Sequence, residues 1–495
     1  MKSILKAVAF LVAVSATSQA QITSSEYAAR RAALATNLQN GIVVALGNPE
    51  PEEDFLSFHQ NSNFKYLTGF SEPEAALVMV VRNGAIAGTP LLFVQPSDPA
   101  REVWTGNRLG IAAVRSTLGL EGRDIATLAK VVDSIASLES SGTLYKIGRF
   151  NSDGPIITRD DQVVGGLVKN KSRLSLKPAN DEVERLRRVK TEAELALLRR
   201  SVNITVAAHR DVMRLVEPGM NEFELQALIE YSFRRNGADR PSFSTIVGSG
   251  PNSTTLHYNA NDRFIDKDDV IVMDIGASYR GYAADVTRTV PADGTFSDAQ
   301  RDIYVAVRAA QAAAEAAASV NGPARALSDA ANASLDASLA KLGLIESAGA
   351  TFDCDAAGRQ CSQRTLYYMH GLGHGIGLDV HDPGAATGAG NLVPGTAFTI
   401  EPGIYVRGNL LQILPDTPKN RAMIAKIRAA VQKYANIGVR IEDDYVVTSS
   451  AVEWISRAPR EIAEVEAIMK EPWTGPSPRD AATVEAYRST GRRGP

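Results

Sequence analysis

Cysteines, long apolar runs and basic clusters are all scarce in this chain of 495 residues. Its net charge is -3 and no long basic run occurs, so bulk electrostatics give no indication of nucleic-acid binding and a peptide or small substrate fits better. Beyond residue 20 no apolar run approaches the roughly 20 residues that span a bilayer, so we expect no stable membrane anchor.

The only two cysteines are Cys354 and Cys361, which lie close together in the sequence. In an oxidising compartment they can pair. Closing a loop of eight residues is worth about 2.5 kcal/mol in the chain-entropy model, less any strain. Metal ligation by this pair alone is the alternative.

The first 20 residues are typical of an export signal. Lys2 and Lys6 precede a short apolar stretch at residues 7–14, and Ser18 and Ala20 place small residues where a signal peptidase reads. The apolar stretch is too short for a membrane anchor. We therefore expect an exported protein, periplasmic or secreted, whose mature chain starts near Gln21.

The remaining sequence predicts two domains and a tail. Residues 21–180 alternate short apolar runs with turn residues, which predicts an α/β domain. Thr191 and Glu194 form a capping box that opens a helix, and Ser297 with Gln300 opens another, within an α+β domain at residues 181–470. Residues 471–495 are rich in proline and glycine and predict a loosely held tail.

Residues 370–382 contain three of the six histidines of the chain, with glycines at alternate positions between the first two. Such spacing suits a backbone that must approach something closely or adopt unusual dihedrals. A glycine-rich loop that contains histidines by chance is the alternative. The number of histidines, together with the carboxylates described next, favours an active site.

Four carboxylates accompany these histidines. Asp274 ends a buried-strand pattern and Asp285 resumes a strand after a turn; with the turn centred between residues 279 and 280, the two lie opposite each other, about 5 Å apart. Glu401 precedes a proline, and Glu442 lies in a strand two residues after Arg440. Four carboxylates and one imidazole carry a charge near -4, which two divalent cations neutralise.

In this order and context, Asp274, Asp285, His374, Glu401 and Glu442 resemble the five metal ligands of the pita-bread metallopeptidases. The resemblance is closest to the aminopeptidase P (Xaa-Pro aminopeptidase) group. It includes segments 60–70, 72–75, 101–110, 245–250 and 256–258 and covers roughly residues 25–470. It implies a pita-bread catalytic domain behind a creatinase-like N-terminal domain.

The resemblance also implies roles for the site residues. Two divalent ions, usually Mn²⁺ with Zn²⁺ or Co²⁺ as alternatives, would share an activated water that attacks a peptide whose second residue is proline. Glu401 would carry a proton to the departing proline nitrogen. Two further groups of residues follow from the family: His257 and His381 would contact the substrate and the intermediate, while His370, Tyr405 and Arg440 would line the proline side or support the ligands.

Trp104 resembles a tryptophan that approaches the site from a neighbouring subunit in the family's homodimers or homotetramers; an ordinary core tryptophan is the alternative.

Three rival functions stay open. A prolidase shares metals and fold but cleaves dipeptides, a non-catalytic relative keeps the fold as a binding module, and a creatinase-like hydrolase lacks the acidic ligands. The five residues in register disfavour the last two.

Overall fold

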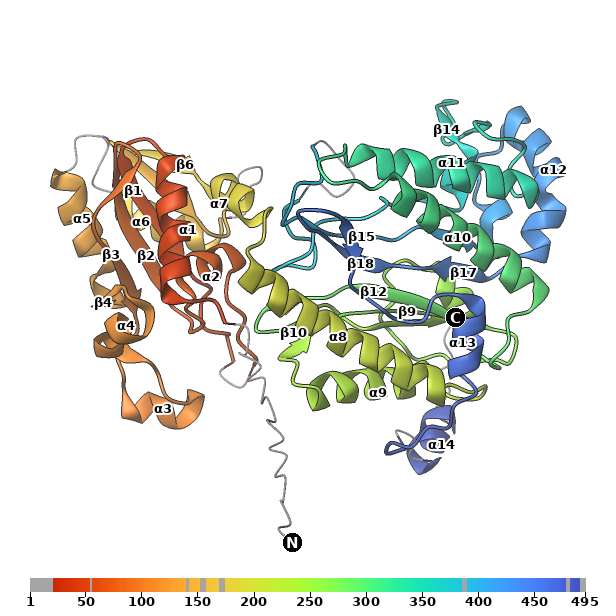
Figure 1. The fold of residues 1–495 in the computed structure, drawn as a ribbon, viewed down its shortest axis with the longest axis horizontal. Helices are drawn as coiled ribbons and strands as arrows, with labels where there is room; N and C mark the ends of the chain where they lie inside the picture. Colours follow the sequence, from red (N-terminus) through yellow and green to blue (C-terminus); the bar gives the residue numbers. More distant parts are fainter. Residues whose placement is uncertain are drawn as a thin grey trace, which may run out of the picture.

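The structure is a computed structural model, and it describes residues 21–53, 56–138, 142–151, 157–168, 174–384, 390–477 and 481–489. The predicted export signal, residues 1–20, lies outside the described residues. Figure 1 shows two domains side by side, joined near α7 (Asn180–Arg187) and α8 (Glu192–Leu215). The prediction of an α/β domain followed by an α+β domain is confirmed.

The N-terminal domain is built on one six-stranded sheet of order β4-β3-β2-β1-β5-β6. Its central strand β1 is buried on both faces, because Val43 and Ala45 enter one apolar cluster while Ile42 and Val44 enter another. A continuous apolar run is what such a doubly covered strand requires. The strands are β1 (Gly41–Leu46), β2 (Ala76–Arg82), β3 (Ala85–Val94), β4 (Glu121–Asp124), β5 (Thr143–Ile147) and β6 (Ser175–Pro178).

Helices cover both faces of this sheet. Residues of α1, α2, α4 and α7 pack into one cluster, and residues of α5 and α6 pack into the other. Helix α3 stands apart at the lower end of the domain in Figure 1, and none of its residues is buried. The helices are α1 (Ser24–Thr36), α2 (Ser62–Thr68), α3 (Pro99–Thr105), α4 (Gly110–Leu118), α5 (Leu128–Leu138) and α6 (Arg159–Val168).

In the C-terminal domain, strands lie between two helical layers, with α8 and α9 on one side and α10 and α11 on the other (Figure 1). Capping boxes at Thr191, Asn221 and Ser297 start α8, α9 and α10, and those predicted at Thr191 and Ser297 are confirmed. Each cap is worth about 1 kcal/mol. The helices after α8 are α9 (Glu222–Arg235), α10 (Asp298–Ala317), α11 (Arg325–Lys341), α12 (Pro418–Lys433), α13 (Ile462–Ile468) and α14 (Ala481–Ser489).

The strands of this domain form small sheets that meet in its middle, with orders β12-β9-β8, β15-β18-β19, β16-β17 and β11-β10-β7. Hydrogen bonds join the groups: the Glu442 amide donates to the Thr287 carbonyl at 3.1 Å. The strands are β7 (Arg240–Pro241), β8 (Ile246–Ser249), β9 (Val270–Ile275), β10 (Ala277–Tyr279), β11 (Tyr282–Ala283), β12 (Val286–Pro291), β15 (Ala397–Ile400), β16 (Gly403–Val406), β17 (Ile437–Arg440), β18 (Asp443–Val447) and β19 (Val452–Trp454).

Cys354 and Cys361 form a disulfide across a hairpin of β13 (Thr351–Asp353) and β14 (Gln360–Ser362). The hairpin contacts α12 through Asp353, whose backbone amide donates to the side-chain oxygen of Asn420 at 2.9 Å. Figure 1 shows β14 at the outer edge, beyond α11 from the central strands. The segment therefore decorates the surface and does not cover the strands that carry the predicted ligands.

The predicted tail after Lys470 contains α14, in which Val484 is buried and Arg488 lies over the Phe264 ring at 4.6 Å. Residues 478–480 and 490–495 of that tail lie outside the described residues. Among the described residues, no helix combines the length and the apolar character needed to cross a membrane.

Candidate metal centre

The two aspartates of the β9–β12 hairpin share one face of the ladder without lying opposite each other. Asp274 pairs with Thr287, so the predicted pairing of Asp274 with Asp285 is wrong by two residues. A shift of two keeps both side chains on the same face. The aspartates are therefore diagonal neighbours, for which about 7–8 Å is typical.

The turn of this hairpin explains the error. Tyr279 pairs with Tyr282, which leaves Arg280 and Gly281 as the two central residues. Both have positive φ, 52° and 88° respectively. Two-residue turns of this kind match the twist of the strands and need left-handed dihedrals, which glycine adopts most readily. The turn is therefore centred one residue later than predicted.

His374 presents one ring nitrogen to the carboxylates. Its Nδ1 lies 3.0 Å from the Gly375 carbonyl, so Nδ1–H donates there and Nε2 keeps its lone pair. Burial lowers the His374 pKa to about 4, which leaves the ring neutral. Nε2 lies 3.5 Å from Asp285, 3.4 Å from Glu401 and 3.9 Å from Glu442. A neutral imidazole with a free Nε2 is the form that binds a metal.

The acidic side chains around this nitrogen are buried and short of partners. Asp274 Oδ1, Asp285 Oδ1 and Glu442 Oε1 accept no hydrogen bond from the described residues. Ligand atoms of Asp285, His374 and Glu442 all lie within 4.8 Å of one another. Buried carboxylates at such spacing need protons or a cation between them.

Burial and mutual repulsion set the proton affinity of this cluster. Burial, and next the charge of Glu442, raises the pKa of Asp285 well above its ordinary value. Glu442 shows the same direction, through burial and then the charge of Glu401. Burial raises the pKa of Glu401 to about 8. Oxygen-rich ligands with one imidazole suit a hard divalent cation, so the residues fit a metal.

A chain of hydrogen bonds leads away from the cluster. Arg440 donates to Asp274 Oδ2 at 2.6 Å and to the Tyr405 hydroxyl at 2.9 Å. His370 Nδ1 lies 2.8 Å from the Gly371 carbonyl, so its Nε2 accepts from Tyr405 at 2.9 Å. Burial lowers the His370 pKa to about 4. The ring is therefore neutral and the donor directions along this chain are fixed.

Comparison with known proteins agrees with this geometry. The profile of Metallopeptidase family M24 matches residues 196–449, and that of the Aminopeptidase P, N-terminal domain matches residues 27–145. The chain belongs to metallopeptidase family M24. A Xaa-Pro aminopeptidase of Escherichia coli is 33% identical over 91% of this chain and 98% of its own length. A human Xaa-Pro dipeptidase is 30% identical over 89% of this chain and 92% of its own length.

Solved structures agree with the sequence matches. A variant of Escherichia coli aminopeptidase P superposes with a TM-score of 0.76 at 29% identity, covering 91% of this chain and 98% of that chain. A zinc-substituted form of the same enzyme in complex with product gives a TM-score of 0.75 over the same shares. The predicted fold, a pita-bread domain behind an N-terminal α/β domain, is thereby confirmed.

The structure brings most of the predicted M24 site residues together. The His381 ring lies 4.2 Å from the His374 ring, centre to centre. His257 is exposed, close enough to His370 for its charge to lower the His370 pKa. Trp104 is the exception: it lies on α3 of the N-terminal domain with its surface 77% exposed, which excludes the core alternative.

Several supporting residues of this M24 site were missed from the sequence. Thr287 donates to Glu442 Oε2 at 2.7 Å and accepts from Arg440 Nε at 3.1 Å. The sequence does indicate that Thr287 lies near the cluster, because it follows Asp285 by two residues and therefore shares its face of the strand. Arg187 and Lys190 both bind Asp382, next to His381. That contact joins residues almost 200 positions apart, which no local pattern reveals.

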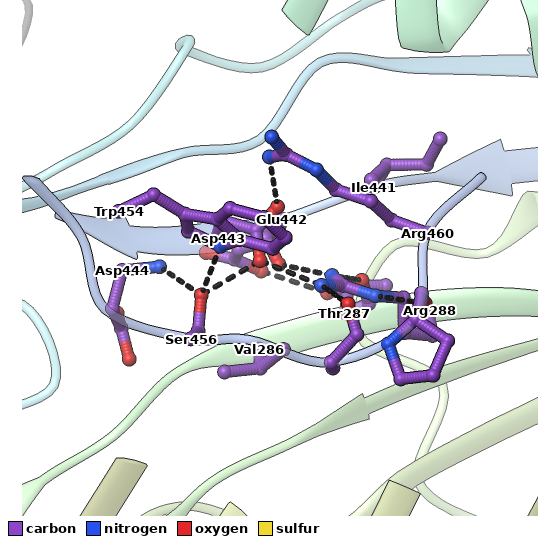
Figure 2. A network of polar contacts seen from close by, with 12 residues as sticks. Val286, Thr287, Arg288, Ile441, Glu442, Asp443, Asp444, Trp454, Ser456 and Arg460 are labelled. Carbon is purple, nitrogen blue, oxygen red and sulfur yellow. Dashed lines mark hydrogen bonds and ion pairs between the residues drawn. The ribbon is translucent and has the colours of Figure 1, made fainter. Parts of the chain in front are cut away.

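A buried ion-pair network contacts the backbone of Glu442. Arg288 Nη1 donates to the Glu442 carbonyl at 2.7 Å, and its Nη2 donates to Asp443 at 2.6 Å. Figure 2 shows Arg288, Ser456 and Arg460 converging on the Asp443 carboxylate. Neither Arg288 nor Asp443 has any exposed side-chain surface. Glu442 therefore projects from a rigidly fixed backbone.

Two glycines of the histidine stretch allow the close backbone approach that their spacing predicted, and what they approach is the protein's own backbone. A Cβ at residue 373 would lie 2.0 Å from the Thr399 carbonyl oxygen, and one at residue 375 would lie 2.4 Å from that of Asp382. Gly371 has open space around it. Gly373 and Gly375 thus let the stretch pack against β15 and against itself, which places His374.

Proposed function

We propose that this chain is a metal-dependent aminopeptidase that hydrolyses the N-terminal Xaa-Pro bond of peptides. One observation carries the proposal: unpartnered buried carboxylate oxygens surround the free Nε2 of His374. The similarity to the Escherichia coli Xaa-Pro aminopeptidase supports the substrate class, because it covers both domains and 98% of that protein.

Asp274, Asp285, His374, Glu401 and Glu442 would hold two divalent ions, with Mn²⁺ as the ion of choice and Zn²⁺ or Co²⁺ as alternatives. When bound, the ions polarise the scissile carbonyl and lower the pKa of the attacking water. The number and identity of the ions rest on the ligand set and on the family resemblance.

The residues of the chain supply the proton transfers and the binding contacts. Glu401 would take a proton from water and hand it to the departing proline nitrogen. His257 and His381 would hydrogen-bond the substrate and stabilise charge as it develops. Because an Xaa-Pro bond has no N–H, the ring itself must be recognised. His370, Tyr405 and Arg440, joined by hydrogen bonds, would form that side of the site.

The proposal is tested by mass spectrometry of the products from Xaa-Pro, Xaa-Pro-Yaa and longer Xaa-Pro peptides, with Mn²⁺ and with chelator. Release of the first residue from the longer peptides is expected, and chelator should stop it. Cleavage of dipeptides alone would instead identify a prolidase. Asp285→Ala should abolish turnover, whereas Asp329→Ala, which alters an exposed carboxylate on α11, should not. Unchanged activity of Asp285→Ala would refute the metal mechanism.

Two further parts of the proposal concern assembly and location. Trp104 and Val103 are each 77% exposed on α3, which supports contact with a neighbouring subunit in a homodimer or homotetramer. The sequence of residues 1–20 supports export to the periplasm or medium. The Cys354–Cys361 disulfide suits such an oxidising compartment. Light scattering and the intact mass of the mature protein test these two points.

A further inference from the structure

Glu222, the first residue of α9, has a fully buried carboxylate that accepts five hydrogen bonds. Its Oε1 accepts from the Ser249 amide and hydroxyl, both at 2.7 Å, and from Asn252 at 3.2 Å. Its Oε2 accepts from the Tyr258 hydroxyl at 2.8 Å and from the Arg263 amide at 3.0 Å. All five partners can donate, which suits a carboxylate that only accepts.

These partners belong to one segment of the chain. Ser249 ends β8, Asn252 lies in the short 3₁₀ helix Gly250–Thr254, and Arg263 follows a stretch without regular structure. His257 lies within that stretch, directly before Tyr258. A loop without a backbone ladder needs other hydrogen bonds to stay in place. Glu222 supplies them at both ends and beside the histidine.

We propose that Glu222 is a positioning residue for His257 and acts through the Tyr258 hydroxyl. The inference rests on the role given to His257 in the proposed function and deepens it. Glu222 itself touches no substrate. It fixes the backbone that carries the exposed His257, whose charge acts on His370. A misplacement of about 1 Å in such a group costs on the order of a hundredfold in rate.

Tyr258→Phe tests the link by removing one hydroxyl from a half-buried ring; besides Glu222, that hydroxyl contacts Asp262 within the same loop. Tyr434→Phe is the matched control, since it removes a hydroxyl that also donates to a carboxylate at 2.8 Å, that of Asp302. In the Mn²⁺-loaded enzyme we expect kcat on an Xaa-Pro-Yaa peptide to fall roughly tenfold for Tyr258→Phe, with metal content and KM little changed. The control should retain full kcat.

A double-mutant cycle separates positioning from a general loss of structure. In a His257→Ala background, Tyr258→Phe should change kcat by less than about twofold, because the group it positions is gone. An equal fall in both backgrounds would overturn the inference while leaving the proposed function intact. Wild-type kcat for His257→Ala would overturn it as well. No turnover by the wild-type enzyme on any Xaa-Pro peptide would instead refute the proposed function.

Hydrogen exchange gives a readout that needs no activity. Amides of residues 255–263 should exchange faster in Tyr258→Phe than in the wild type, and Tyr434→Phe should leave them unchanged. Glu222→Gln should loosen the same residues, because one of its two oxygens becomes a donor that faces other donors. Unchanged exchange in both Tyr258→Phe and Glu222→Gln would mean that Glu222 does not hold this loop.

Discussion

Metal removal should make the stability of this protein fall as the pH rises. In the metal-free chain, burial raises the pKa of Glu401 to about 8, whereas the unfolded carboxyl has its ordinary value of 4.5. The folded state therefore binds a proton that the unfolded state has released. Such a group adds stability that is complete below pH 4.5 and is lost as the pH passes through 8. The raised pKa values of Asp285 and Glu442 act in the same direction.

Above pH 6.5 the buried histidines do not contribute to the change of stability with pH, so the contribution of Glu401 can be measured there. Burial lowers the pKa of His370 and of His374 to about 4, so both destabilise the fold only below their ordinary value of 6.5. Between pH 6.5 and 9, Glu401 alone lowers the free energy of unfolding by about 2 kcal/mol. For a domain of about 250 residues this corresponds to a fall in Tm of roughly 4 °C.

Calorimetry of chelator-treated protein between pH 6.5 and 9 measures this fall. Added Mn²⁺ should reverse the trend, because the metal needs deprotonated ligands and binds better as protons leave. Glu401→Gln should flatten the metal-free curve by about 2 kcal/mol, since a neutral amide cannot titrate. A metal-free Tm that is constant or rises over this range would refute the reasoning. So would a Glu401→Gln curve with the wild-type slope.

Three further predictions concern residues outside the acidic cluster. Cys354→Ser should lower the free energy of unfolding by about 2.5 kcal/mol in urea titrations and leave kcat unchanged, because the hairpin lies away from the central strands. Arg288→Met should cost at least about 3 kcal/mol by the same measurement, because it removes a partner of the buried Asp443. Trp104→Ala should leave Tm within about 1 °C, since the side chain is 77% exposed, yet lower kcat/KM if a neighbouring subunit uses it. Equal kcat/KM in the variant and the wild type would exclude that use.

Local patterns were enough to single out the carboxylates of the candidate metal centre but not their geometry. Asp274 and Asp285 were recognised because a buried-strand pattern ends or begins at each of them. Their register depended on whether the turn centred before or after Arg280. The structure settled it through the left-handed dihedrals of Arg280 and Gly281. Asp274 and Asp285 were predicted to lie opposite each other, and the structure places them diagonally. Both side chains nevertheless lie on the predicted common face of the hairpin.

Contacts between distant residues outside the candidate ligand set escaped prediction. Arg288 and Asp443 are 155 positions apart, and nothing in either local sequence specifies the other. The five hydrogen bonds by which Glu222 braces the loop that carries His257 also connect segments that no local pattern links. In a sequence, charged residues of this kind cannot be told from ordinary surface residues. Their structural role is visible only from their burial and their hydrogen-bond partners in the folded protein. The pairing of Cys354 with Cys361 needed less, because two cysteines leave a single choice.

The structure changes the charge argument for two metal ions. From the sequence, four carboxylates were expected to carry a charge near -4, and Arg440 was placed on the proline side. In the structure Arg440 is buried and donates to Asp274 at 2.6 Å, so it cancels part of that charge within the cluster. Neutrality alone therefore no longer decides between one ion and two.

The positions of the unpartnered carboxylate oxygens favour two metal ions over one. Asp274 still has a free buried Oδ1 on the side away from Arg440, although it lies outside the compact group of Asp285, His374 and Glu442. One ion at that compact group would leave the Asp274 oxygen buried without a partner, which is costly. A second ion that includes Asp274 would satisfy it. Asp274→Asn should then lower the metal content from two ions toward one per chain, while Asp285→Asn, which alters the compact group itself, should weaken binding of the ion that this group would hold.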